Sequence, residues 1–216
     1  MRIIFVRHGE TEYNTESRYQ GHTDSMLSEP GLWQSARVAK RLEDEEIAAV
    51  YSSDLSRAAE TARAIASLHD LPVLTDLDLR ESAFGDWEGL TVREIAERYP
   101  DVWRSYLRDS VTHRAPNGER LEQMQERVVR AIDSISKSQP GETVVVVTHG
   151  GPIRAFFCHA FNAPLQTFRK IRLDNCGITI LSLRPDGRWF LEVLNGVSHL
   201  DDAESPDEPD SMVADA

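Results

Sequence analysis

Two short apolar segments, far apart in the sequence, each end in a histidine next to a glycine. Residues 3–6 (Ile-Ile-Phe-Val) are followed by Arg-His-Gly, and residues 144–147, four valines, are followed by Thr-His-Gly-Gly. Runs this short and this rich in β-branched residues predict buried strands rather than helices. Ligands of open α/β sheets bind beyond the carboxyl ends of the strands. The two histidines, His8 and His149, therefore stand where a binding site is expected.

The rest of the chain alternates predicted strands with predicted helices. This alternation indicates an α/β fold with a mostly parallel sheet covered on both faces. Two late segments joined by an Arg-Pro-Asp-Gly turn predict an antiparallel hairpin at the edge of that sheet. The remaining predicted strands cover residues 47–51 and 72–74, the hairpin covers 178–183 and 189–194, and the main helices cover 28–42, 55–68, 121–135 and 152–161.

Four local predictions accompany this outline. The helix at residues 28–42 is expected to bury one apolar face, formed by Leu32, Ala36, Ala39 and Leu42. Residues 11–25 are polar and without a clear period, which predicts a loop over the site. Thr91 with Glu94 fits a capping box that opens a helix, and Pro100 is expected to end it. We expect residues 101–118 to form an irregular, substrate-facing excursion.

Length and charge limit the organisation and the partners of the chain. A chain of 216 residues suits one domain, which we place at residues 1–200. The tail, residues 201–216, is acidic and poor in apolar residues, a composition typical of disorder. The net charge of −12 argues against nucleic acid and anionic membrane surfaces as partners, because both require a basic field. A small anionic substrate remains compatible, and a homodimer stays open.

Cysteine usage and hydropathy point to the cytoplasm. Cys158 and Cys176 match no zinc spacing, and isolated buried thiols are favoured over a single disulfide. No apolar run approaches the roughly 20 residues that cross a bilayer. The first predicted strand starts at Arg2, so we expect no signal peptide.

Arg57 lies in the first turn of the helix predicted at residues 55–68. A cation there opposes the helix macrodipole, whereas a bound anion would satisfy both the guanidinium and the free backbone N–H groups. A solvated arginine that reaches Glu60 is the alternative interpretation. The position on its own does not decide between them.

A phosphoryl-transfer site follows if Arg7, His8, Arg57, Glu81 and His149 converge. Arginine forks match phosphate oxygens and stay charged, and a neutral imidazole is a competent nucleophile near neutral pH. The second histidine would stabilise charge on the phosphoryl oxygens, and Glu81 would protonate the leaving oxygen. A metal site of His8, His149 and Glu81 is the main competitor, but two arginines nearby would repel a cation. We therefore expect neither metal nor cofactor.

These motifs resemble the histidine phosphatase superfamily, also called the phosphoglycerate mutase-like group. The resemblance lies in five segments that occur in family order and cover nearly the whole chain to residue 199. They are Arg-His-Gly-Glu-Thr at 7–11, Arg-Tyr-Gln-Gly-His-Thr-Asp at 18–24, Ser-Ser-Asp-Leu-Ser-Arg-Ala-Ala-Glu-Thr-Ala at 52–62, Leu-Arg-Glu at 79–81 with Phe-Gly-Asp-Trp-Glu-Gly at 84–89, and Thr-His-Gly-Gly at 148–151.

The resemblance implies a three-layer α/β/α sandwich and assigns residue roles. By its position in the motif, His8 matches the histidine that becomes phosphorylated, and Glu81 matches the usual proton donor. The remaining matches are phosphate-pocket residues Arg7, Arg57 and His149, and phosphate or substrate contacts Asn14, Gln20, Gly21 and the backbone of Gly150.

The resemblance favours the phosphatase branch of the family. The mutases that the chain resembles carry a longer basic insertion between the acid and the second histidine, and here that segment is short. The sequence thus predicts a metal-independent phosphatase of small phosphorylated metabolites. A phosphoglycerate mutase and a non-catalytic phosphate-binding scaffold are the alternatives. Arg120, where many relatives carry a small hydroxyl residue, would either contact an acidic substrate or face water, with water slightly favoured.

Overall fold

The computed structural model describes residues 1–201. The predicted acidic tail falls almost entirely on residues 202–216, which lie outside the described residues. In the described part, no helix is both long and apolar enough to cross a membrane.

A six-stranded sheet in the order β3-β2-β4-β1-β5-β6 forms the centre of the molecule. The first four strands of this order run parallel: β3 (Val73–Thr75), β2 (Ala49–Ser52), β4 (Thr143–Thr148) and β1 (Arg2–Arg7). β5 (Ile178–Leu183) is antiparallel to β1 and pairs with β6 (Trp189–Gly196) as a hairpin at the edge. The mostly parallel sheet with an antiparallel edge hairpin is confirmed.

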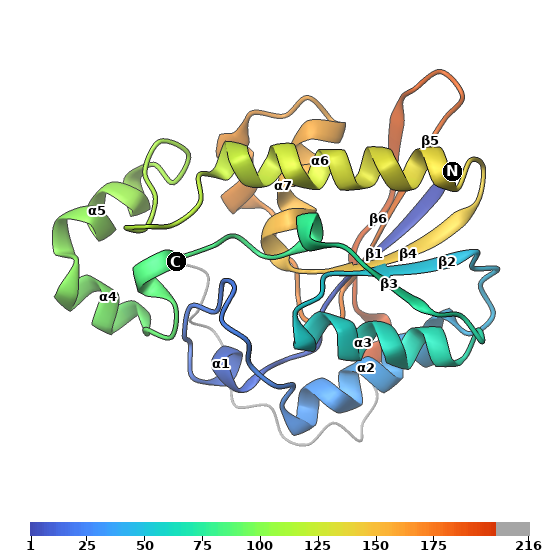
Figure 1. Ribbon diagram of the computed structural model, residues 1–216, viewed down its shortest axis with the longest axis horizontal. Helices are drawn as coiled ribbons and strands as arrows, with labels where there is room; N and C mark the ends of the chain where they lie inside the picture. Colours follow the sequence, from blue (N-terminus) through green and yellow to red (C-terminus); the bar gives the residue numbers. More distant parts are fainter. Residues whose placement is uncertain (202–216) are drawn as a thin grey trace.

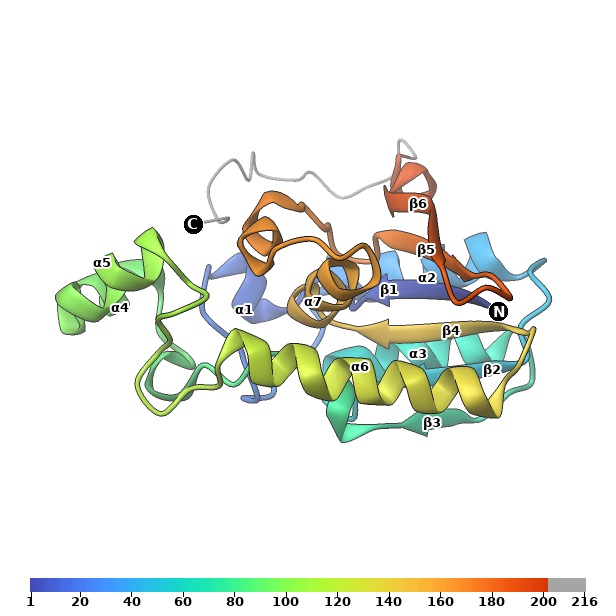
Figure 2. The ribbon, with the colours of Figure 1, turned by 90° about the horizontal axis from the view of Figure 1, so that it is seen from above.

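Helices cover both faces of the sheet and complete a three-layer sandwich (Figures 1 and 2). α6 (Leu121–Ser138) and α7 (Gly150–Ala160) lie on one face, and α2 (Glu29–Leu42) and α3 (Ser56–Ser67) lie on the other. Strand side chains alternate between the two cores, because successive residues of a strand point to opposite faces. Ile3 and Phe5 pack with α6 and α7, whereas Ile4 and Val6 pack with α2 and α3.

The buried face of α2 differs from the predicted one. Ala39 and Leu42 are buried as expected, but Leu32 is 55% exposed and Ala36 is exposed as well. The helix instead turns Gly31 inward. A Cβ atom there would lie 1.9 Å from the backbone oxygen of Glu10, so only glycine lets the backbones approach this closely. Contact with the chain segment after β1, rather than apolar content, sets the orientation of α2.

Two consecutive helices within residues 92–108, which we call the α4–α5 excursion, extend beyond the end of the sheet (Figure 1). Thr91 and Glu94 form the predicted capping box of α4 (Val92–Arg98). The prediction that residues 101–118 are irregular is wrong in part, because α5 (Pro100–Arg108) is a helix. α4 ends at Arg98, directly before Tyr99 and Pro100, as expected. Pro100 also opens α5, since the first helical position needs no N–H donor.

A small aromatic core holds this excursion together. Trp103 and Tyr106 of α5 pack against Trp87, with ring centroids 5.4 and 5.0 Å from the Trp87 ring. Trp87 is the last residue of the 3-10 turn η2 (Gly85–Trp87). The described chain also contains the one-turn helix α1 (Glu12–Thr15), within the segment predicted as a loop, and the 3-10 turns η1 (Leu77–Leu79), η3 (Leu165–Lys170) and η4 (Ser198–Leu200).

Candidate active site

The pairing of β1 with β4 brings the two histidines together. The strands are neighbours and parallel, with Arg7 opposite Thr148, so the residues that follow them meet at one edge of the sheet. The His8 backbone N–H donates to the Thr148 carbonyl at 2.9 Å. The His8 and His149 ring centroids lie 5.0 Å apart, edge to face.

The His8 ring presents one nitrogen for chemistry. Its Nδ1 lies 2.7 Å from the Gly9 carbonyl, which only accepts, so Nδ1 carries the proton and Nε2 keeps its lone pair. Burial lowers the pKa of His8 well below its ordinary value, and the charges of Arg57 and Arg7 lower it further. His8 is therefore a neutral imidazole at neutral pH. Its side chain lines a cavity.

The His149 ring lies behind His8 and is fully buried. Its Nε2 lies 2.9 Å from Ser53 Oγ, and its Nδ1 is buried with no hydrogen-bond partner among the described residues. Desolvation lowers the pKa of His149 well below normal, with Arg57 adding to the effect. Ser53 was missed as a site residue, although its place directly after a predicted strand was a usable signal.

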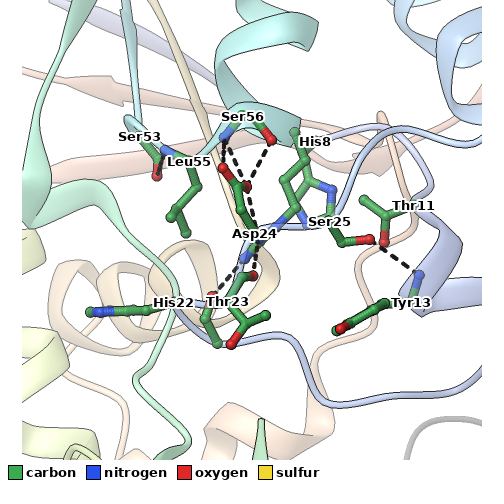
Figure 3. A network of polar contacts seen from close by, with 12 residues as sticks. His8, Thr11, Tyr13, His22, Thr23, Asp24, Ser25, Ser53, Leu55 and Ser56 are labelled. Carbon is green, nitrogen blue, oxygen red and sulfur yellow. Dashed lines mark hydrogen bonds and ion pairs between the residues drawn. The ribbon is translucent and has the colours of Figure 1, made fainter. Parts of the chain in front are cut away.

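Arg57 is buried and pinned by the loop that precedes α2. Its guanidinium donates to the Gly21 carbonyl at 2.7 Å and to the Thr23 carbonyl at 3.1 Å, and it lies 3.8 Å from the Asp24 carboxylate. With 1% of its side chain exposed, the solvated alternative involving Glu60 is wrong. Asp24 also accepts from the Ser56 backbone N–H and hydroxyl at the start of α3 (Figure 3).

Glu81 points toward the start of α7. Its carboxylate accepts the Ser82 N–H at 2.8 Å and the Gly151 N–H at 3.2 Å. A Cβ atom on residue 151 would lie 2.0 Å from Glu81 Oε1, so the glycine makes room for the acid. Arg127 of α6 holds the backbone here by donating to the Glu81 carbonyl at 2.8 Å.

A cavity of about 500 Å³ joins most of the predicted site residues. Its lining includes Arg7, His8, Arg57 and Glu81, together with the expected substrate contacts Asn14, Gln20 and Gly21. His149 and Gly150 are not among the residues that line it. Gln20 Oε1 is buried without a hydrogen-bond partner among the described residues.

Tyr106 of α5 lines the cavity, as expected for the substrate-facing segment 101–118. Arg154 of α7, and Phe168 and Arg169 of η3, also line it and were not predicted. No sequence motif marked them, because their segments meet the site only through the tertiary fold. Arg120 is exposed and outside the cavity lining, in agreement with the interpretation that it faces water.

The chemistry of this site suits an anion. Fixed guanidinium groups flank a neutral imidazole, and a carboxylate lies across the same cavity. Within residues 1–201 no group of histidine, cysteine and acidic side chains is arranged to hold a metal ion. The arrangement can bind a phosphoryl group and offer it both a nucleophile and a proton donor.

The histidine phosphatase superfamily (branch 1) matches residues 3–196 of this sequence. The chain belongs to the histidine phosphatase superfamily. It is 39% identical over 204 residues to phosphoglycerate mutase-like protein 4 of Arabidopsis thaliana, with 93% of this chain and 87% of the relative covered. It is 37% identical over 201 residues to a metal-independent phosphoserine phosphatase of the same plant, with coverage of 92% and 82%.

Solved structures of other histidine phosphatases share the fold. The mycobacterial glucosyl-3-phosphoglycerate phosphatase, solved with VO3, superposes with a TM-score of 0.83 at 33% identity and covers 91% of this chain and 99% of its own. Phosphatases thus recur among the similar sequences and structures, and this histidine phosphatase is a phosphatase enzyme.

Proposed function

We propose that this histidine phosphatase hydrolyses small phosphomonoesters through a phosphohistidine on His8, without a metal ion. The unprotonated Nε2 of His8, a residue that lines the same cavity as Arg7 and Arg57, is the observation that carries the proposal. Attack by this nitrogen forms an N–P bond and breaks the P–O bond of the ester. Glu81 delivers the proton that the leaving oxygen needs.

The second half of the reaction reverses these roles. Glu81 takes a proton from a water molecule, whose oxygen attacks phosphorus and releases inorganic phosphate and His8. Arg7, Arg57 and His149 stabilise the charge on the phosphoryl oxygens in both steps. A cytoplasmic location is part of the proposal, and the two buried free thiols, Cys158 and Cys176, support it.

Phosphate release from p-nitrophenyl phosphate in the presence of a chelator tests the proposal. We expect full activity with chelator, no turnover by His8→Ala, and an acid-labile, base-stable phosphoprotein when the reaction is quenched early. Loss of activity on chelation, or turnover by His8→Ala, would overturn the mechanism.

Mutase activity is a second outcome to measure, because one relative is named a phosphoglycerate mutase-like protein. With phosphoglycerate as substrate, a mutase moves the phosphoryl group between hydroxyls and releases no phosphate. A phosphatase releases stoichiometric phosphate. Tight vanadate binding without turnover of any ester would instead favour a phosphate-binding scaffold.

A further inference from the structure

The cavity has the opposite charge to the molecule that contains it. The chain carries a net charge of −12, yet arginine and lysine side chains greatly outnumber the two carboxylates in the cavity lining, Glu81 and Glu119. Glu119 is already engaged, because both of its oxygens accept from Arg127 at 2.8 Å. Two of the lining arginines, Arg18 and Arg172, pair with carboxylates outside the lining. Arg154, Arg169 and Lys170 add cationic side chains to those of Arg7 and Arg57.

Three of the cationic side chains come from α7 and the turn that follows it. Arg154 projects from α7, and Arg169 and Lys170 end the η3 turn that follows this helix. Arg154 is adjacent to the phosphate pocket: its Cζ lies 4.0 Å, and Arg7 Nε lies 3.8 Å, from the point where a Cβ of residue 150 would stand. The two guanidinium groups thus approach the same wall of the cavity.

Arg154 and Arg169 each lie over an aromatic ring of a residue that lines the cavity. The Arg154 guanidinium carbon lies 5.8 Å from the Phe168 ring centroid, and the Arg169 guanidinium carbon lies 4.6 Å from the Tyr106 ring centroid. Arg169 also donates to the Leu107 carbonyl at 3.4 Å. Stacking on a ring face orients a guanidinium, whose hydrogen-bond donors lie along its edge.

We infer that Arg154 and Arg169 form a second anion subsite, which selects phosphomonoesters that also carry a carboxylate. The inference rests on the proposed function and adds the substrate class. Planar guanidinium forks match a carboxylate bidentately. The subsite is continuous with the phosphate pocket, so a short substrate spans both, with its phosphoryl group at His8 and its carboxylate toward η3.

Matched substrate pairs test this subsite. 3-Phosphoglycerate and glycerol 3-phosphate differ only in a carboxylate that replaces a hydroxymethyl group, and phosphoserine and phosphoethanolamine differ only in a carboxylate. We expect wild-type kcat/KM to favour the carboxylated member of each pair by about tenfold or more, because charge-assisted hydrogen bonds are roughly twice as strong as neutral ones. Added salt should reduce this preference.

Arg169→Met and Arg154→Met should each lower the ratio of carboxylated to neutral kcat/KM by about tenfold, mainly through KM. Arg120→Met removes an exposed arginine outside the cavity and should leave that ratio unchanged. A second measurement avoids catalysis: calorimetry with the His8→Ala protein should show tighter binding of 3-phosphoglycerate than of glycerol 3-phosphate, and Arg169→Met should remove the difference.

The possible failures are distinguishable. Equal kcat/KM for both members of each pair, or an equal loss on both after Arg169→Met, would refute the subsite and leave the phosphatase proposal intact. A preference for a bisphosphate over both carboxylated esters would refute the carboxylate assignment. Absence of phosphate release from every ester, p-nitrophenyl phosphate included, would instead refute the proposed function.

Discussion

At the scale of single residues, the site depends on two features: the unprotonated ring nitrogen of His8 and the absence of a Cβ atom at Gly151. In the proposed mechanism His8 attacks phosphorus through Nε2, because its Nδ1 proton is donated to the Gly9 carbonyl at 2.7 Å. Glu81 can reach the start of α7 because residue 151 has no Cβ atom. An added Cβ atom would have room at Gly150 but not at Gly151, so these neighbouring glycines offer a matched test.

Gly151→Ala should impair proton delivery. The added Cβ would lie 2.0 Å from Glu81 Oε1, so the carboxylate must move. We expect kcat to fall by about 100-fold on alkyl esters, a loss in the range usual for a displaced general acid, and to fall less on p-nitrophenyl phosphate, whose leaving group needs little protonation. Gly150→Ala meets nothing closer than 3.8 Å and should cost less. Equal losses in both variants would contradict this role of the glycine.

The buried histidines should make stability depend on pH. Burial lowers the pKa of His8 and His149 in the folded state, so below about pH 6.5, the ordinary histidine value, the unfolded chain binds protons that the folded chain does not. Each histidine then contributes a fall in unfolding free energy of up to roughly 1.4 kcal/mol per pH unit as pH drops.

Urea denaturation at pH 7.5, 6.5 and 5.5 measures this effect. The contribution of these histidines is fully present above pH 6.5 and declines below it. His8→Asn should flatten the dependence, since one of the two groups no longer titrates. A pH profile identical in wild type and variant would exclude His8 as a contributor.

At the scale of elements, α6 anchors the loop that carries Glu81. Its Arg127 donates to the carbonyls of Asp78, Arg80 and Glu81 at 2.6 to 2.9 Å and forms a two-pronged pair with Glu119. One helical side chain thus fixes the loop that carries Glu81. Three residues along the same helix, Arg130 makes an exposed pair with Asp78.

Arg127→Met and Arg130→Met form a matched pair of variants. Arg127→Met leaves Glu119 unpaired in a mostly buried place and should lower the unfolding free energy by about 3 kcal/mol. Arg130→Met breaks an exposed pair, 64% and 36% exposed, and should cost less than about 1 kcal/mol. Chemical denaturation measures both.

A second readout separates positioning from stability. In Arg127→Met, activity on alkyl esters should fall more than activity on p-nitrophenyl phosphate, because the loop of Glu81 loses its anchor. Equal effects on both substrates would reduce Arg127 to a structural role.

At the scale of the whole molecule, the cavity is lined by two parts of the structure, the sheet with its helices and the α4–α5 excursion, whose hydrophobic cores differ in size. The sheet shares large cores with the helices on both faces. The α4–α5 excursion has only a small aromatic core around Trp87, Ile95 and Trp103. Figures 1 and 2 both show these helices beyond the edge of the sheet where β1 and β4 end.

Hydrogen exchange should therefore be uneven. We expect amides of α4 and α5 to exchange well before those of β1 and β4, since small satellite cores open locally at less than the global free energy. Mass spectrometry of peptic peptides checks the order. Simultaneous exchange of α5 and β4 would show that the excursion is part of the main cooperative unit.

The sequence by itself determined the elements whose local chemistry is strong. The β-branched runs before His8 and His149 became β1 and β4, and the apolar positions of α6 are buried as their spacing predicts. The motifs named the five central side chains of the site. Arg7, His8 and His149 stand at strand ends and Arg57 in the first turn of a helix, whereas Glu81 lies in a loop and was named by the family resemblance.

Only the tertiary structure decided features that depend on contacts between distant segments. The neighbouring places of β1 and β4, the choice of Gly31 rather than Leu32 as the buried side of α2, and the helical state of α5 were not readable from local patterns. The partners Ser53, Arg127, Arg154 and Arg169 reach the site from four different segments. Their roles arise from proximity in space, which carries no periodic signal along the chain.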